Sequence, residues 1–193
     1  MSSLKARTRA NSRLTALLDA AAKQFAEKGY KATTTRDIAK EVKMQPGSVY
    51  YHFKSKGELL LAVYEVGVER VSKRVKEAVE GKTQPLPKLK SALRAHLDVI
   101  LDETAYARVL ATVQPSEVPE FEAQLIALRD DYERIFTKLM KDLPFKKGSD
   151  RSVIRMLTIG AANYAQWWYR PDGKTPEYLA DQLSAMIEGC LKE

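Results

Sequence analysis

Apolar residues recur every three or four positions along most of the chain, which is the spacing of amphipathic helices. Alternation with period two, typical of strands, is rare, so the predicted class is all-α. Pro, Gly and capping residues divide the pattern into about nine helices. These are expected over residues 12–28, 34–42, 46–53, 55–79, 89–101, 104–113, 117–143, 152–169 and 175–191. Residues 1–11 precede the first of them, and we expect a mobile basic arm there.

Residues 34–56 hold the most specific local pattern. Thr34 and Asp37 have the spacing of a capping box, and Pro46 suits the first position of a second short helix. Val49 and Phe53 are four apart and are expected to face inward. Two short helices joined by three residues match the helix-turn-helix of DNA-binding proteins.

The second short helix is expected to present a polar face outward. That face holds Gln45, Gly47, Ser48, Tyr50, Tyr51 and His52. Hydroxyl, amide and imidazole groups of this kind bond base edges or phosphates in the major groove. Two alternatives stay open: a helix pair with a polar face that binds nothing, and a Tyr50 or Tyr51 that lies partly in the core.

Charge is distributed unevenly and favours the DNA-binding interpretation. Residues 1–56 hold 12 Lys and Arg against four acidic residues, whereas residues 57–193 hold 20 against 21. A basic module joined to a neutral body is typical of proteins that bind a polyanion. We therefore divide the chain into a DNA-binding domain, 1–56, and a ligand-binding and dimerisation domain, 57–193.

Residue types argue against several other classes of protein. The chain has one cysteine, Cys190, two histidines, no Gly-rich phosphate loop and no Cys/His metal spacing, so we expect no catalytic site, metal or cofactor. His96 is interpreted as a core or solvated residue. No apolar run approaches the ~18 residues of a membrane span, and no secretory segment is present at the start, so the cytoplasm is the expected location.

The N-terminal pattern resembles the TetR family of bacterial transcriptional regulators. The residues that carry the resemblance are Phe25, Gly29, Tyr30, Ala32–Thr34, Asp37–Ala39, Gly47, Tyr50–Phe53, Ser55, Lys56 and Leu59. It implies a homodimer on palindromic operator DNA. Lys43 stands where the family usually has Gly, and Gln45 stands where it has a small cap.

The resemblance also implies roles for individual residues. Thr34, Tyr51, His52 and Lys56 would hold phosphates, and Gln45, Gly47, Ser48 and Tyr50 would face bases. Thr35, Arg36 and Pro46, beside them, complete the expected DNA-binding set.

The C-terminal half, in residues 127–133 and 160–171, resembles a branch that represses fatty-acid and steroid catabolism and releases DNA on binding an acyl-CoA thioester. That resemblance implies an acyl-CoA effector and a homodimer formed through the last two helices. Two other functions stay open. One is a regulator of drug efflux that responds to lipophilic compounds, and the other is a DNA-binding protein without a small-molecule switch.

Aromatic and basic residues of the body are the candidate ligand contacts. Trp167 or Trp168 would line an apolar cavity with Asn163, while Arg108 or Arg170 would meet phosphate at its mouth. Alternatively, the tryptophans belong to the core or to the dimer interface, where aromatic residues are common. Basic groups at the mouth would favour acyl-CoA, and a buried acid would favour a cationic drug.

Overall fold

The computed structural model describes residues 2–102 and 104–192, and side chains from Ser12 onward. Over these residues the fold is all-α, as predicted, with nine α-helices and no β-strand. The helices are α1 (Ser2–Ala32), α2 (Thr35–Glu41), α3 (Pro46–His52), α4 (Lys56–Val79), α5 (Pro85–Ile100), α6 (Ala105–Thr112), α7 (Glu122–Lys141), α8 (Arg151–Tyr164) and α9 (Pro176–Glu188). No described helix is both long and apolar enough to cross a bilayer.

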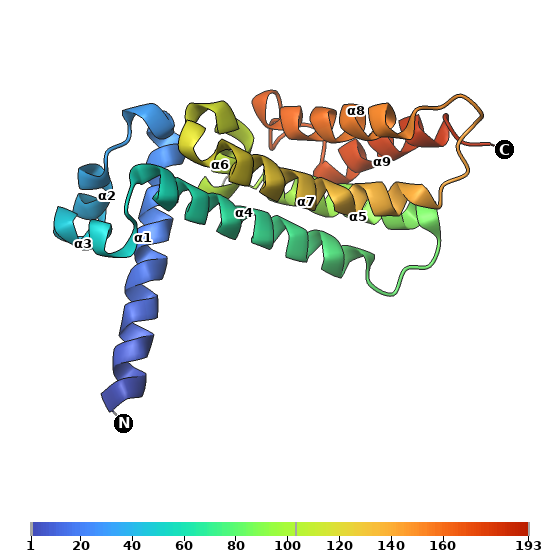
Figure 1. Ribbon diagram of the computed structural model, residues 1–193. Helices are drawn as coiled ribbons and strands as arrows, with labels where there is room; N and C mark the ends of the chain where they lie inside the picture. Colours follow the sequence, from blue (N-terminus) through green and yellow to red (C-terminus); the bar gives the residue numbers. More distant parts are fainter. Residues whose placement is uncertain (1, 103, 193) are drawn as a thin grey trace.

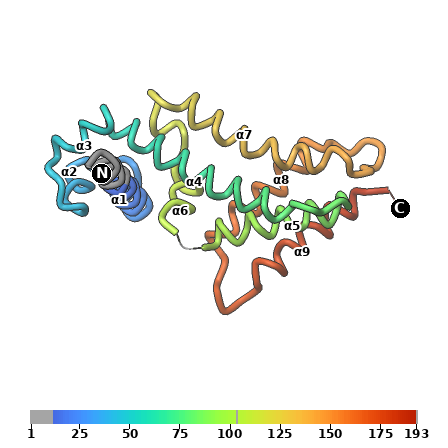
Figure 2. Tube along the Cα trace, turned by 90° about the horizontal axis from the view of Figure 1, so that it is seen from below, coloured from blue at the N-terminus to red at the C-terminus, as the bar shows by residue number. Residues whose placement is uncertain are grey.

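The helices form a small head and an elongated body joined by α4 (Figure 1). The head contains α1 to α3. From there α4 runs into the body, where it packs on α5, α6 and α7. In turn, α5 packs on α9, and the view from below shows these two helices together along one side of the body (Figure 2). One continuous helix therefore touches both parts of the molecule.

Two boundaries of the first helix differ from prediction. The helix begins at Ser2 rather than Ser12, since Leu, Lys, Ala and Arg in this stretch are good helix formers and nothing breaks it. Gly29 does interrupt the helix, with φ 77° and ψ 165°, but helical structure resumes and continues to Ala32. The predicted end is therefore a kink, at a residue that tolerates positive φ.

Boundaries in the body also shifted, because local turns override the helical period. Two 3₁₀ turns, Pro115–Glu117 and Pro119–Phe121, delay α7 to Glu122. Helix α8 begins at Arg151 rather than at residue 152, and the carboxylate of its cap, Asp150, accepts from two backbone N–H groups. This helix ends at Tyr164 in a 3₁₀ turn, Ala165–Trp167, instead of continuing to residue 169.

The head and the body share one hydrophobic cluster. Phe25, Ile38, Val49 and Leu59 are fully buried in the head and at the start of α4. The same cluster contains side chains of α6, of the following segment and of the start of α7, namely Tyr106, Val109, Val113, Val118 and Leu125. A second cluster joins the rest of α4 to α5, α7, α8 and α9. The head is therefore packed against part of the body, beyond the predicted boundary at residue 56.

Gly57 permits this close packing. A Cβ at this position would lie 2.5 Å from Glu120 Oε1 and 2.8 Å from Phe121 Cδ2, both in the second 3₁₀ turn. Such distances are too short for any side chain larger than hydrogen. The start of α4 therefore lies directly against the segment that leads into α7.

Lys43, in the α2–α3 joint, has φ 53°, which is the left-handed region that favours glycine. We expect Lys43→Gly to raise the free energy of unfolding by about 0.5–1 kcal/mol, because relief of about 1–2 kcal/mol is partly offset by greater chain entropy in the unfolded state. Urea denaturation measures the change. The matched variant Lys40→Gly, exposed in the last turn of α2, should instead lower it by up to about 1 kcal/mol. An equal decrease in the free energy of unfolding in both variants would contradict backbone strain at Lys43.

Candidate nucleic-acid interface and body cavity

The helix-turn-helix has the predicted local geometry. The Asp37 backbone N–H donates to Thr34 Oγ1 at 3.2 Å, and the Thr34 N–H donates to Asp37 Oδ2 at 3.2 Å, which completes the capping box. Val49 of α3 is fully buried and Phe53 is half-buried against the same core. These contacts fix which face of α3 points outward.

The outward face of α3 is polar and accessible. Tyr51 is 87% exposed and Tyr50 is 54% exposed, so the interpretation of either as a core residue is wrong. Gln45 is exposed and makes no capping hydrogen bond with its side chain. Gly47 is exposed too, with open space where a side chain would be. This face therefore has the accessibility that contact with DNA requires.

Thr35 is a correction to the expected DNA-binding set. It is buried, and its hydroxyl lies 3.1 Å from the Tyr50 hydroxyl. The side chain therefore ties α2 to α3 and is largely withdrawn from the surface. Arg36, by contrast, is exposed, and Pro46 is half-buried at the first position of α3.

Lys56 is the second correction. Its Nζ donates to the backbone carbonyls of Tyr30 at 2.7 Å, Thr33 at 2.9 Å and Lys31 at 3.3 Å. It also lies 4.3 Å from the centroid of the Tyr30 ring. An ammonium has three N–H donors, and here all three have acceptors, so none is left for a phosphate.

Thr33 also binds the carbonyls of this segment; in the sequence it is part of the family resemblance, without a role of its own. Its buried hydroxyl lies 2.8 Å from the Gly29 carbonyl and 3.0 Å from the Gln24 carbonyl. Carbonyls at a helix end need partners outside the helix. Thr33 and Lys56 supply them and hold α1, α2 and α4 together.

We expect Lys56→Met to lower the free energy of unfolding by about 1–3 kcal/mol, because three hydrogen bonds to a charged donor are lost while the apolar stem is kept. Thermal or urea denaturation measures this. The slope of DNA affinity against salt concentration should stay unchanged. A slope shallower by about 0.9, with unchanged stability, would instead indicate a phosphate contact.

A surface hollow of about 380 Å³ lies beside the start of α3. Its lining combines α1 with the α2–α3 joint: Arg13, Ala16, Val42, Lys43, Met44, Gln45 and Ser48. Arg13 and Lys43 thus flank two of the predicted base-facing residues with positive charge. In the sequence Lys43 stands out only as a departure from the family pattern, and Arg13 does not stand out; Arg13 reaches this face because α1 packs beside the joint.

The body contains a small cavity between α4, α5, α6, α7 and α8, with a volume of about 70 Å³. Its walls are mostly apolar, with Tyr64, His96, Tyr132 and Asn163 as polar members and Arg129 and Glu133 as charged ones. His96 is only 1% exposed, which confirms its interpretation as a core residue. Burial lowers its pKa to about 4, although the neighbouring Asn163 side chain, which makes no hydrogen bond of normal length to His96, acts in the opposite direction.

The structure brings only one of the predicted ligand residues to this cavity, Asn163. Trp167 and Trp168 are 63% and 51% exposed and do not line it. The reason is local, since α8 ends at Tyr164 and the following turn directs the indoles outward. Arg108 and Arg170 are exposed and lie outside the cavity lining as well.

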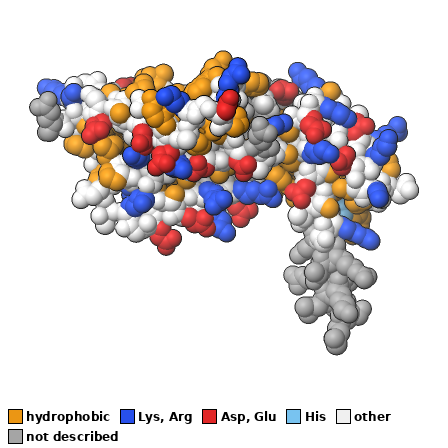
Figure 3. Space-filling view, turned by 180° about the vertical axis from the view of Figure 1, so that it is seen from behind, with side chains coloured by type: hydrophobic (Ala, Val, Ile, Leu, Met, Phe, Trp, Pro, Cys, Tyr) orange, Lys and Arg blue, Asp and Glu red, His pale blue; other side chains and the backbone are white. Residues whose placement is uncertain are grey.

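The tryptophans instead belong to an exposed apolar surface on α8 and α9. Its members are Val153, Met156, Leu157, Tyr164, Trp167, Trp168, Tyr178 and Met186. Their spacing in α8 follows one helix face, with Gly160 in the middle and no atom near the position of its missing side chain. Hydrophobic side chains gather along the upper edge of the molecule in the space-filling view (Figure 3). Patches of this kind mark interaction sites.

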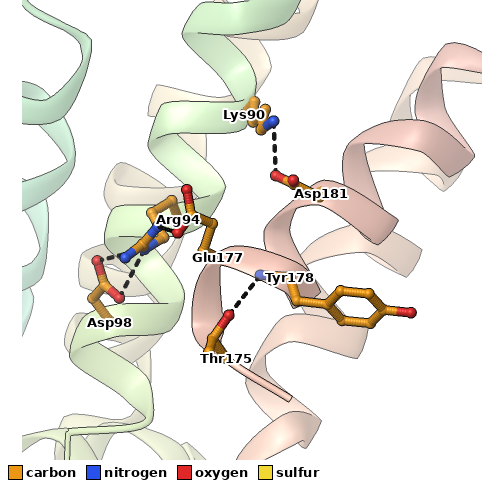
Figure 4. Close-up of polar contacts among 7 residues, drawn as sticks. All are labelled: Lys90, Arg94, Asp98, Thr175, Glu177, Tyr178 and Asp181. Atoms are coloured by element: carbon orange, nitrogen blue, oxygen red, sulfur yellow. Dashed lines mark hydrogen bonds and ion pairs between the residues drawn. The ribbon is translucent and has the colours of Figure 1, made fainter.

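The opposite side of α9 is bound to α5 by ion pairs (Figure 4). Lys90 Nζ lies 2.8 Å from Asp181 Oδ1, and Arg94 Nη1 lies 2.9 Å from Glu177 Oε2. Tyr178 points away from α5 in this view. One face of α9 is thus used within the chain, and the other contributes to the exposed apolar surface.

Comparisons with known proteins agree with these features. The family model for bacterial regulatory proteins of the tetR family matches residues 17–63, and the tetracyclin repressor-like C-terminal domain matches residues 82–191. The chain is 29% identical over 192 residues to the HTH-type transcriptional repressor KstR2 of Mycolicibacterium smegmatis, covering 94% of this chain and 92% of the relative.

Two solved structures extend the likeness to the whole fold. The ketosteroid transcriptional regulator KstR2 of Mycobacterium tuberculosis has a TM-score of 0.75 and 25% identity, with 95% of this chain and 97% of that one covered. AibR, in complex with isovaleryl coenzyme A and operator DNA, has a TM-score of 0.76 and 23% identity, with 90% and 97% covered. The chain belongs to the TetR family of bacterial transcriptional regulators.

Proposed function

We propose that this regulator is a cytoplasmic repressor that binds palindromic operator DNA as a homodimer and releases it on binding a small-molecule effector. The observation that carries the DNA-binding part is the exposed polar face of α3 on a basic head. Selection from a random duplex library with the intact protein tests it. A palindrome with half-sites about one helical turn apart is expected. Failure to enrich any sequence over competitor polyanions would overturn it.

Gln45 and Ser48 are assigned to base recognition, since both are accessible at the start of α3. We expect Gln45→Ala and Ser48→Ala to change the preferred operator sequence, with a cost of about 1–3 kcal/mol at the affected base pair. A gel-shift panel of single-base operator variants measures this. Uniform weakening across the panel would reverse the assignment.

The homodimer is proposed to form through the exposed apolar surface of α8 and α9. Gly160 would let the α8 helices of two copies approach closely. A dimer is also what the two halves of a palindrome require, because one head alone gives an interface of only about 600–1,000 Å².

The effector is proposed to enter the body cavity and to be an acyl-CoA thioester. A relative of similar length is the repressor KstR2, and a protein of this fold, AibR, was solved with both a CoA thioester and operator DNA. Arg129, at the cavity, is the type of residue that pairs with CoA phosphates. Arg129 is paired with Asp130 in an exposed ion pair, whereas Glu133, the acidic member of the lining, is paired with Arg155 in a more buried one and so is less available to a cationic drug.

Helix α4 is the proposed link between effector and DNA. Tyr64, Val68 and Val71 line the cavity, while Leu59 and Leu60, earlier in the same helix, pack in the core of the head. A ligand that favours another position of α4 would change the spacing of the two α3 helices. It shifts the equilibrium only by its difference in affinity between the two states.

Steroid-derived and long-chain CoA thioesters are the test ligands. We expect them to raise the melting temperature and to release a selected operator in a fluorescence anisotropy titration. A shift with free lipophilic drugs alone, or no shift with any of these compounds, would exclude the acyl-CoA effector.

A further inference from the structure

His96 is held in the wall of the body cavity by one hydrogen bond. Its Nδ1 lies 2.7 Å from the Tyr132 hydroxyl, and its ring stacks on Tyr132 and meets Phe136 edge-on. The other ring nitrogen, Nε2, is buried and has no hydrogen-bond partner among the described residues. Buried polar atoms are rarely left unpaired, so this atom indicates a missing partner in the cavity.

The hydrogen bond also decides which nitrogen carries the proton. The Tyr132 hydroxyl is buried, and Nδ1 of His96 is the acceptor found for it in the described part of the chain. A buried O–H needs an acceptor, so Tyr132 donates and Nδ1 accepts. The proton of the neutral imidazole then lies on Nε2. The unpaired atom is therefore a hydrogen-bond donor.

We propose that the Nε2–H group of His96 donates to an uncharged carbonyl oxygen of the effector, such as that of a thioester or a ketone. This rests on the proposed function of the cavity as the effector site. The 70 Å³ volume takes the few atoms around a carbonyl group, and a longer ligand requires the walls to move apart. His96 is neutral near pH 7, since burial lowers its pKa to about 4, and so it offers no charge to attract a carboxylate.

The expected consequence is selection of the carbonyl itself. A ligand of the same shape without the oxygen leaves the buried donor unpaired. We expect hexanoyl-CoA to bind about ten- to a hundred-fold more tightly than S-hexyl-CoA, in which a methylene group replaces the carbonyl. Isothermal titration calorimetry of the full chain measures both affinities.

Matched variants separate the hydrogen bond from packing. In His96→Leu/Tyr132→Phe, donor and acceptor are removed together and the cavity walls stay apolar. Both ligands should then bind with nearly equal affinity. Tyr132→Phe alone frees Nδ1, so the proton is no longer fixed on Nε2, and the preference should fall without disappearing. An unchanged preference in the double variant would overturn the proposal.

NMR spectroscopy of the protein with ¹⁵N-labelled histidine shows directly which ring nitrogen of His96 carries the proton. The chain has two histidines, and His52→Asn assigns their signals. We expect the free protein to show the proton of His96 on Nε2 at pH 7, and a shift of that signal with hexanoyl-CoA but not with S-hexyl-CoA. A proton on Nδ1 in the free protein would overturn the proposal.

A second pair of probes distinguishes this proposal from the proposed effector class. Cyclopentanone and methylenecyclopentane have the same shape and differ in the carbonyl oxygen. A shift with cyclopentanone alone, when hexanoyl-CoA neither binds nor releases DNA, would keep the His96 site and exclude acyl-CoA. Release of DNA by CoA thioesters while no carbonyl compound shifts the His96 signal would exclude the role of His96 and keep the proposed function.

Discussion

Raising the monovalent salt concentration from 50 to 200 mM is expected to weaken operator binding about a thousand-fold. The excess positive charge of the chain lies within residues 1–56, and the dimer presents two such heads. Each neutralised phosphate releases counterions, and about six contacts give a loss of this size. Fluorescence anisotropy at several salt concentrations gives the slope of log K against log salt, expected near −0.9 per phosphate contact.

Charge-removing variants locate the contacts. Arg36 and Lys40 are exposed on α2. Because the dimer carries each substitution in both heads, Arg36→Gln and Lys40→Gln are each expected to make the slope shallower by up to about 1.8, which is about 0.9 for each phosphate contact removed. Lys138→Gln, exposed on α7 of the body, removes the same charge and should leave the slope unchanged. A flat salt dependence of the unmodified protein, or an equal effect of Lys138→Gln, would contradict the assignment of DNA contacts to the head.

Leu157→Glu is expected to convert the dimer to a monomer and to lower operator affinity by at least about a hundred-fold. Leu157 is 69% exposed in the middle of the α8–α9 apolar surface, so the change leaves the interior of the chain intact. In a symmetric dimer each substitution meets its own copy, which brings two carboxylates into an apolar interface. Analytical ultracentrifugation measures the mass, and anisotropy measures the binding of DNA.

The control is Ala127→Glu, which adds the same charge to an exposed position of α7. It should stay dimeric and bind the operator as the unmodified protein does. Circular dichroism should show unchanged helix content in both variants. A Leu157→Glu protein that remains dimeric would exclude this surface as the interface and leave the exposed tryptophans without an explanation.

Local chemistry explains why the helix-turn-helix was predicted well. The Thr34–Asp37 capping box, Pro46 at the start of α3 and the buried Val49 all depend on neighbours within a few residues. Interactions between residues this close in the chain can be predicted from the sequence alone. The same reasoning failed at the ends of α7 and α8, where 3₁₀ turns replace helical residues of suitable period.

Side-chain roles were predicted less well where a long-range partner decides them. Lys56 is a residue type that often binds phosphate. In the structure its ammonium group instead donates to backbone carbonyls at the end of α1, more than twenty residues earlier. Thr35 follows Thr34, the exposed cap of α2, but its hydroxyl contacts the Tyr50 hydroxyl and so connects α2 with α3. Trp167 and Trp168 are large aromatic residues of the kind that line cavities. Because α8 ends at Tyr164, both lie on the surface instead.

The sequence by itself determined the all-α class, the helix-turn-helix and the basic head, because each follows from local periodicity, capping chemistry or charge along the chain. The family came from the resemblance of residues within 25–59 to a known pattern. Only the tertiary structure decided which polar side chains already have hydrogen-bond partners and which apolar side chains are exposed. It paired Lys56 with α1, left Nε2 of His96 unpaired beside a cavity and exposed the apolar face of α8. The physical reason is that hydrogen-bond partners and burial depend on residues far apart in the chain. The pattern of residues adjacent in sequence does not specify these long-range contacts.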